Sequence, residues 1–276
     1  MKFLFNGLSF TNDGAGLCSK GSFLSHLTPT RHDDGEEKGK IHLVYQDRVG
    51  NSAMGNCATA QLTDEGKASL FKLGLNLHEA YVYRTPFLKP FPVPEELYLR
   101  STEIPRAIES AQNLLHGLFP AWAAGKGAQH VNLDIYIKEE KVEYLFPNVA
   151  NCRKLGKLQE QAREECKQRQ KADTEQLLAK VKDVVPAAGA NSVAYLHDSI
   201  ACAQAHQIPL PKEVTAEVFS EAERLQVDHW WSVFENSEVA TRLAIGRVVG
   251  DIVDNLKNKA EGKTPLKVPL PSPPLN

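Results

Sequence analysis

The stretch spanning residues 97–120 constrains what this chain can fold into more than any other segment. Residues 96–99 predict a short strand, residues 100–102 a turn, and the residues that follow an amphipathic helix. The helix is indicated by apolar residues at helical spacing, namely Ile108, Ala111, Leu114, Leu115 and Leu118. The sequence therefore predicts a strand–turn–helix unit here.

The turn of this unit carries residues suited to starting a helix. Ser101 or Thr102 can cap it, Glu103 is expected in its first turn, and Pro105 is tolerated there. Arg100 is then expected where a strand leads into a helix N-terminus, a place that offers N–H donors and positive potential to a phosphate. A guanidinium can also bind a phosphate through two parallel hydrogen bonds. The alternative is that Arg100 pairs with a structural carboxylate.

This segment also resembles the signature of a known family. The residues that carry the likeness are Arg100, Ser101, Thr102, Glu103, Arg106, Ser110, Ala111 and the helix end at 117–120. They resemble the histidine acid phosphatase family, which is branch 2 of the histidine phosphatase superfamily. The likeness covers about residues 58–257 in the family's order, through 61–66, 73–74, 145–148 with Cys152, 208–211, 230–231 and 242–246. Residues 61–66 and the region of Tyr81 resemble the lysophosphatidic acid phosphatase branch more than the others.

The resemblance implies an α/β fold, with a mixed sheet flanked by helices and a helical cap. It implies hydrolysis of a small-molecule phosphomonoester through a phosphohistidine, without a metal or other cofactor, and it gives Arg100 the role of binding the substrate phosphate. The family's chemistry also uses an RHGxRxP motif, whose histidine is the nucleophile, and a late HD pair, whose aspartate protonates the leaving group.

The only RH dipeptide in the chain is Arg31-His32. It is followed by no second arginine and no proline, and acidic residues at 33, 34, 36 and 37 would repel a phosphate dianion. We therefore disfavour His32 as the nucleophile.

The chain has two HD dipeptides, His32-Asp33 in the acidic segment just described and His197-Asp198, which needs separate consideration. Residues 192–196 before the second pair could pass for a strand, but residues 201–211 match a family segment that lies well before the catalytic pair. We therefore disfavour His197 and Asp198 as catalytic residues and predict that they lie on the face of a helix.

Both ends of the sequence lack the patterns that the family would place there. The tail, residues 261–276, has prolines at 269, 271, 273 and 274, and proline cannot donate to a strand ladder, so we expect no central strand from it. Residues 1–5 are a brief apolar run without the longer apolar core of a signal peptide. The expectation is a family member truncated at both ends, with an incomplete sheet.

The chain divides by pattern into five parts. We expect a poorly patterned segment at 1–57 with one short strand at 41–45, part of the α/β core at 58–137, a mostly helical cap at 138–235, a core helix at 236–260 and a proline-rich tail at 261–276. In the core helix, Gly246 and Gly250 suggest close packing against a neighbour, beside an apolar side formed by Ile245, Val248, Val249, Ile252, Val253 and Leu256. Trp230 and Trp231 are expected to pack inside the core or cap.

Composition narrows the function classes. With 32 basic and 34 acidic side chains the net charge is −2, which gives no electrostatic case for binding nucleic acid. No apolar run approaches the roughly 20 residues of a membrane span. The nine histidines form no metal-ligand pattern, and five cysteines, an odd number, fix neither disulfides nor compartment.

Three functions follow as alternatives. The first is a histidine acid phosphatase, and the second is a catalytically inactive fragment or degenerate relative that keeps a phosphate-binding or interaction role through Arg100. The third, a helical scaffold built on residues 151–257, ignores the segment at 97–120.

Overall fold

A computed structural model of the chain describes residues 61–126, 131–184, 192–235 and 237–271. The expectations for residues 1–57, including His32 and the strand at 41–45, lie outside the described residues. The elements are, in chain order, α1 (Asp64–His78), η1 (Glu79–Arg84), η2 (Pro94–Glu96), β1 (Leu97–Thr102), α2 (Pro105–Leu118), α3 (Pro120–Ala123), β2 (Ile135–Lys138), η3 (Glu140–Val142), α4 (Arg153–Arg169), α5 (Lys171–Val181), α6 (Val193–Ala205), α7 (Ala216–Trp231), α8 (Glu238–Ala260) and β3 (Val268–Pro271).

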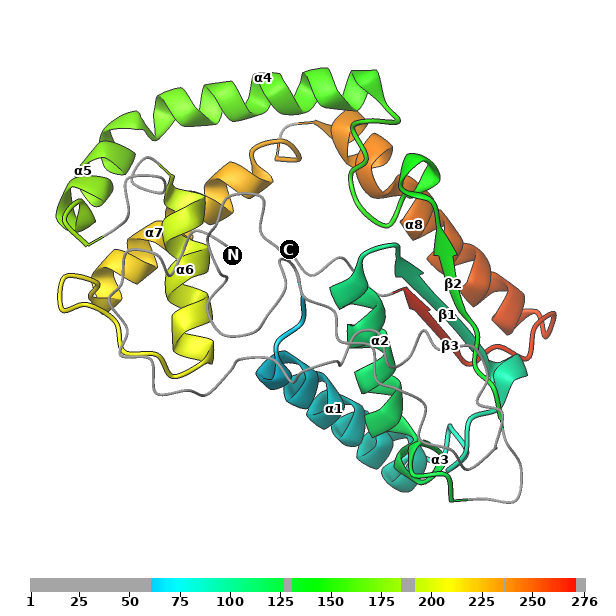
Figure 1. The fold of residues 1–276 in the computed structure, drawn as a ribbon. Coiled ribbons are helices and arrows are strands. Elements are labelled where there is room, and N and C mark those ends of the chain that lie inside the picture. The colour runs from blue at the N-terminus through cyan, green and yellow to red at the C-terminus, as the bar shows by residue number, and fades with distance from the viewer. Residues whose placement is uncertain (1–60, 127–130, 185–191, 236, 272–276) are drawn as a thin grey trace, which may run out of the picture.

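The three described strands form one parallel sheet in the order β2-β1-β3. β1 is central, and its Leu99 pairs with Ile135 of β2 and Leu270 of β3. Helices α1, α2 and α3 lie beside this sheet, while α4 to α7 form a separate helical group (Figure 1). The described residues thus give an α/β fold with a helical cap, as the sequence predicts.

The strand of the 97–120 unit is longer than the sequence indicates. β1 continues through Thr102, which pairs with Lys138, so Arg100 and Ser101 belong to the strand and not to a turn. The cap of α2 is Ile104, without a side-chain hydrogen bond, and Pro105 is its first residue. The predictions that Ser101 or Thr102 caps the helix and that Glu103 lies in its first turn are therefore wrong. The reason is that backbone pairing with β2 extends the strand to Thr102.

Part of the proline-rich tail forms a strand, β3, which the sequence does not predict, although it is not a central strand of the described sheet. β3 lies at the edge of the described sheet, where a strand tolerates proline because one side of its backbone needs no ladder partner. Lys267 anchors the start of β3, since its N–H donates to the carbonyl of Glu96 at 2.8 Å and its ammonium pairs with the Glu96 carboxylate at 2.9 Å.

Helices α1 and α2 pack closely against each other. Thr63 caps α1, because its hydroxyl accepts the N–H of Gly66 at 3.2 Å. Where the helices cross, a Cβ on Gly74 would lie 2.2 Å from the carbonyl oxygen of Leu114, and a Cβ on Gly117 would lie 2.0 Å from the carbonyl oxygen of Phe71. Only glycine allows this approach. Their core cluster is Val82, Leu88, Leu97, Leu99, Leu115, Leu118 and Phe119.

The cap has its own hydrophobic cluster. It is built by α5, α6 and α7 from Leu177, Val181, Leu196, Ile200, Val218, Ala222 and Leu225. Residues 151–183 are highly charged and contain α4 and α5, and Leu155 and Cys166 of α4 are fully buried. At the surface, Arg224 of α7 pairs with Asp173 of α5 at 2.7 Å.

Helix α8 is present where the sequence predicts it, but its apolar side is not buried. The predicted stripe is 40–65% exposed at Ile245, Val249, Ile252, Val253 and Leu256. No described atom outside the local chain comes within 4 Å of a Cβ built on Gly250, and that of Gly246 meets only Arg242 of the same helix. Among the described residues, the expected close packing at these glycines is therefore not found. α8 contacts α4 through Ala240 and Ala244, which share a cluster with Leu155 and Val233.

Candidate functional site

The sheet brings Arg100 close to the edge where its strands end. Because the three strands are parallel, their carboxyl ends meet at one edge, and this is where open α/β sheets bind ligands. Arg100 lies in register with Tyr136 of β2 and Pro271 of β3. β1 ends two residues later, at Thr102, and α2 begins at Pro105.

Arg100 forms a buried ion pair with Glu143. Its Nη2 donates to Oε1 of Glu143 at 2.6 Å, and the two side chains are 3% and 1% exposed. The same carboxylate oxygen accepts the backbone N–H groups of Tyr144 at 2.7 Å and Leu145 at 2.8 Å. Three donors converge on one oxygen, so Glu143 fixes the position of the guanidinium. The structural carboxylate that the sequence leaves open for Arg100 is thus Glu143.

Polar atoms at the end of β1 are incompletely satisfied. Nε of Arg100, Oε2 of Glu143 and Oγ1 of Thr102 are buried without a hydrogen-bond partner among the described residues. Buried polar groups are normally paired, so unpaired ones call for an explanation such as a ligand or strain. The role of Arg100 as a phosphate ligand stays a prediction.

Sequence reasoning did not single out Glu143. It stands directly before the segment 145–148 that carries part of the family likeness, but it is one of three glutamates within five residues, with Glu139 and Glu140. Its partner is 43 residues away in the chain. Only the fold distinguishes it from its neighbours.

Three cationic side chains surround the ring of Tyr144. The distances to the ring centroid are 4.6 Å for Arg100, 4.1 Å for Lys138 and 4.6 Å for Arg247. The cations come from β1, the end of β2 and α8, and so three elements meet at this ring. Each contact is within the range of a cation–π interaction.

Tyr144 also ties the segment after β2 to α8. Its hydroxyl donates to Oδ2 of Asp251 at 2.6 Å. This hydrogen bond to a carboxylate, together with partial burial of the ring, raises the pKa of Tyr144 above its usual value of 10. The phenol therefore stays protonated at neutral pH and keeps donating to Asp251.

His197 and Asp198 lie on α6, as predicted, and not after a strand. Ser192 caps this helix by accepting the N–H of Tyr195, which explains why the residues before the pair are helical. Nδ1 of His197 lies 3.2 Å from Oδ1 of Asp198, and its ring stacks on Phe219 of α7 with 5.4 Å between centroids. These contacts belong to the cap and involve none of the groups around Arg100.

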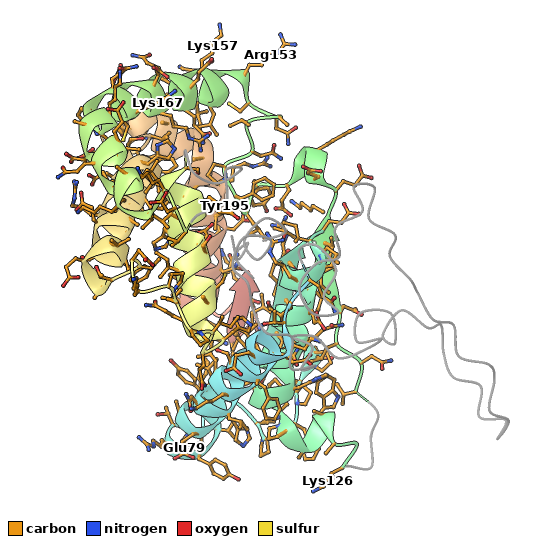
Figure 2. The ribbon with its side chains drawn as sticks, turned by 60° about the vertical axis from the view of Figure 1, so that its left-hand side comes forward. Glu79, Lys126, Arg153, Lys157, Lys167 and Tyr195 are labelled. Carbon is orange, nitrogen blue, oxygen red and sulfur yellow. The ribbon has the colours of Figure 1, made fainter. Side chains whose placement is uncertain are left out.

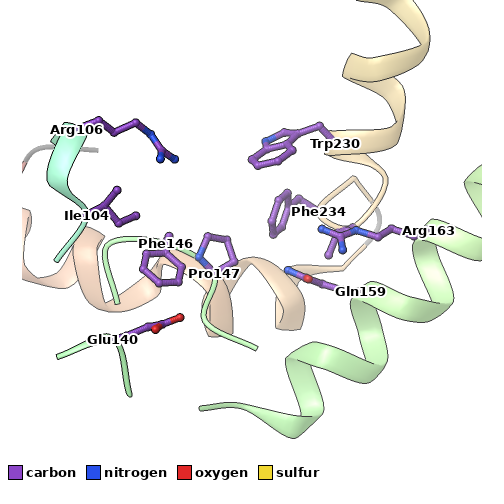
Figure 3. Close-up of a pocket in the computed structure, with 10 residues that line it drawn as sticks. Ile104, Arg106, Glu140, Phe146, Pro147, Gln159, Arg163, Trp230 and Phe234 are labelled. Atoms are coloured by element: carbon purple, nitrogen blue, oxygen red, sulfur yellow. The ribbon is translucent and has the colours of Figure 1, made fainter. Parts of the chain in front are cut away.

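A pocket of about 360 Å³ opens where the core meets the cap (Figure 3). Its volume is at the lower end of the range of about 300–1,000 Å³ that is typical of small-molecule sites. Arg106 points into it from the start of α2, and Trp230 and Phe234 face it from the other side. Trp230 and Trp231 are 44% and 57% exposed, so the expectation that they pack inside the protein is wrong.

The described residues contain no group of three histidine, cysteine or acidic side chains that could hold a metal ion. Three cysteines, Cys152, Cys166 and Cys202, are free thiols. Among the described helices, none combines the length and the apolar character that crossing a membrane requires.

The fold and the arginine at the end of β1 define an α/β protein with a candidate oxyanion site at the carboxyl edge of a parallel sheet. The model of the histidine phosphatase superfamily (branch 2) matches residues 8–236. The chain belongs to this superfamily.

Individual relatives agree with this assignment. The chain is 34% identical to human lysophosphatidic acid phosphatase type 6 over 157 residues, which is 56% of this chain and 35% of that protein. It is 34% identical to the bovine lysophosphatidic acid phosphatase type 6 over 173 residues, 62% of this chain and 38% of that protein. It is also 26% identical to counting factor 60 of Dictyostelium discoideum over 223 residues, 77% of this chain and 52% of that protein. The chain thus spans between a third and about half of these relatives.

Proposed function

We propose that this chain binds phosphomonoesters through Arg100 and that, with the residues of this sequence, it hydrolyses them slowly or not at all. The observation that supports the binding is the place of Arg100, held by Glu143 beside the carboxyl edge of a parallel sheet. The guanidinium keeps an unpaired buried Nε–H, a donor suited to an anion.

The proposed weak activity rests on the two candidate dipeptides, Arg31-His32 and His197-Asp198, neither of which suits the role of nucleophile or acid. Attack on phosphorus needs a positioned nucleophile, and departure of an alkoxide needs a positioned acid. His197 and Asp198, the HD pair within the described residues, contact each other, and the ring of His197 stacks on Phe219 in the cap. His32 lies outside the described residues, and its acidic neighbours argue against it.

The alternative is that the whole protein is an active acid phosphatase, acting through a phosphohistidine on a substrate of the kind that its relatives' names indicate, a lysophosphatidic acid. The observation that favours it is the identity of 34% to the human and bovine lysophosphatidic acid phosphatases type 6.

The first test is turnover of p-nitrophenyl phosphate at acid pH by the purified chain. We expect little or no release of p-nitrophenol. Robust turnover that survives both Arg31→Ala and His32→Ala would contradict the proposal. Turnover that His32→Ala alone abolishes would identify His32 as the nucleophile and favour the alternative.

The second test is binding of inorganic phosphate by isothermal titration calorimetry. Arg100→Lys retains a charge for Glu143 but loses the planar guanidinium, so we expect binding about ten- to a hundredfold weaker, in line with about 1.5–3 kcal/mol for hydrogen bonds to charged groups. Arg242→Lys, at an exposed pair with Glu238, is the matched control and should leave binding unchanged. Equal affinities for the three proteins would contradict a role of Arg100.

A further inference from the structure

Lys138 and Arg247 carry charges that no described carboxylate neutralises. Arg100 has Glu143, but neither Lys138 nor Arg247 forms an ion pair or a hydrogen bond with any described residue, and their contact is the ring of Tyr144. Lys138 is half-buried and Arg247 is exposed, so dissolved ions can reach both side chains.

The geometry around Tyr144 crowds these charges. A ring has two faces, and three cations lie within 4.1–4.6 Å of its centroid, so at least two of them share a face. Like charges that share one face of a ring repel each other, and the repulsion grows where part of the site is shielded from water. An anion between them would relieve it.

The acidic side chains nearby do not cancel this charge. Of the groups in contact with Arg100 or Tyr144, the carboxylates of Glu143 and Asp251 supply two negative charges, against the three positive charges of Arg100, Lys138 and Arg247. Asp251 is engaged by the hydroxyl of Tyr144 at the rim of the ring. The cluster also lies beside the carboxyl ends of the parallel strands, since Lys138 is the last residue of β2.

We infer that Lys138 and Arg247 form, with Arg100, a binding site for a phosphate oxyanion next to the Tyr144 ring. The inference rests on the proposed function and extends it, because it names two further ligands of the phosphate. Lys138 and Arg247 are the accessible members of the site and Arg100 is the buried one. The ligand is the phosphoryl group itself, whether as free phosphate or as the head of a phosphomonoester.

The test is titration of the purified chain with inorganic phosphate, comparing the Lys138→Met and Arg247→Met variants. Because both groups are partly in water, we expect each variant to bind phosphate about three- to tenfold more weakly. Arg242→Met removes the same charge from the same helix but from an exposed pair with Glu238, and it should bind as the unmodified chain does. Circular dichroism melts confirm that the variants are folded.

The outcomes separate this inference from the proposed function. If Arg100→Lys weakens binding and Lys138→Met and Arg247→Met do not, the role of Arg100 stands and the inference is overturned. If Lys138→Met and Arg247→Met weaken binding and Arg100→Lys does not, the inference about these two residues stands and the role of Arg100 falls. An unmodified chain that shows no saturable binding overturns both.

A second measurement needs no variant. Phenylglyoxal modifies accessible arginines, and mass mapping reports each one. Phosphate should slow the modification of Arg247 and leave the modification rate of Arg242 unchanged. If phosphate changes the rate at Arg247 no more than the rate at Arg242, the inference is overturned. A parallel titration with phenyl phosphate distinguishes the source of the phosphoryl group, because tighter binding than that of inorganic phosphate assigns the site to an ester.

Discussion

At the scale of single residues, the pair of Arg100 and Glu143 dominates the site. Both side chains are almost fully buried, and one carboxylate oxygen accepts three hydrogen bonds. Removing charges from water costs several kcal/mol per ion, so such a pair does not by itself show that the fold is stabilised. It does mean that neither charge tolerates the loss of the other.

Replacing Glu143 by Met should therefore destabilise the chain strongly. The variant leaves the Arg100 guanidinium buried and unpaired, which costs about 3–5 kcal/mol in comparable pairs. The double variant Arg100→Met/Glu143→Met should recover most of this loss, since it removes both buried charges. Urea unfolding followed by circular dichroism measures each free energy, and a double variant no more stable than Glu143→Met would contradict this account.

Burial also shifts a titration in the cap. Burial, and after it the charge of Arg163, lowers the pKa of His229 below its usual 6.5. A histidine with a lowered folded-state pKa binds more protons when unfolded, so its contribution is present above about pH 6.5 and is lost as the pH falls toward the folded-state pKa.

We expect the melting temperature of the cap to fall between pH 7.5 and pH 5.5, and to fall less in the variant His229→Gln. Thermal unfolding at the two pH values, monitored by far-ultraviolet circular dichroism, gives the difference. Identical losses in the two proteins would mean that other groups carry the acid sensitivity.

At the scale of elements, the crossing of α1 and α2 sets the shape of the core. Gly74 and Gly117 meet there, and the backbones come so close that an added methyl group on either would overlap a carbonyl oxygen of the other helix. The crossing is reinforced by Lys67 of α1, which pairs with the buried Glu109 of α2 at 3.2 Å.

Gly74→Ala and Gly117→Ala should each destabilise the chain by about 1–3 kcal/mol, because backbone atoms must move apart to admit the new methyl group. Gly250→Ala is the matched control, since its site in α8 is open, and there the better helix propensity of alanine should add up to about 1 kcal/mol. Chemical denaturation measures all three. Similar effects at Gly74 and Gly250 would show that the close crossing does not exist in solution.

At the scale of the whole molecule, the hydrophobic interior is divided. One cluster lies under the sheet and α2, a second lies within α5, α6 and α7, and a third joins α4 to α8. Figure 2 shows the same separation of the helical cap from the core with its sheet. Clusters that share few contacts unfold as separate cooperative units.

We therefore expect unfolding in more than one step. Trp122, whose Nε1 donates to the carbonyl of Val131, reports on the core, whereas Trp230 and Trp231 report on the cap. Leu99→Ala should lower the free energy of the unfolding transition that Trp122 reports by about 2–5 kcal/mol. Leu225→Ala should lower the free energy of the transition that the tryptophans of the cap report by a similar amount. Variants that keep either Trp122 alone or Trp230 and Trp231 alone separate the two fluorescence signals. A single unfolding transition reported by both sets of tryptophans would contradict a divided interior.

Much of the local structure follows from the sequence. Periodicity predicts α2 and α8, and register within the family likeness predicts that His197 and Asp198 lie on a helix. These features depend on neighbours a few residues apart. The strand in the tail was missed, because two prolines, Pro269 and Pro271, argue against a strand unless its place at the sheet edge is known.

The sequence by itself determined the family and several of the helices and singled out Arg100 as a candidate, because these depend on local order along the chain. Only the tertiary structure decided what Arg100 meets. Glu143 is 43 residues away, and Lys138 and Arg247 reach the Tyr144 ring from different elements. Which charged side chains pair depends on their distance in space. That distance is set only when the strands and helices pack together, and it does not follow from spacing in the sequence.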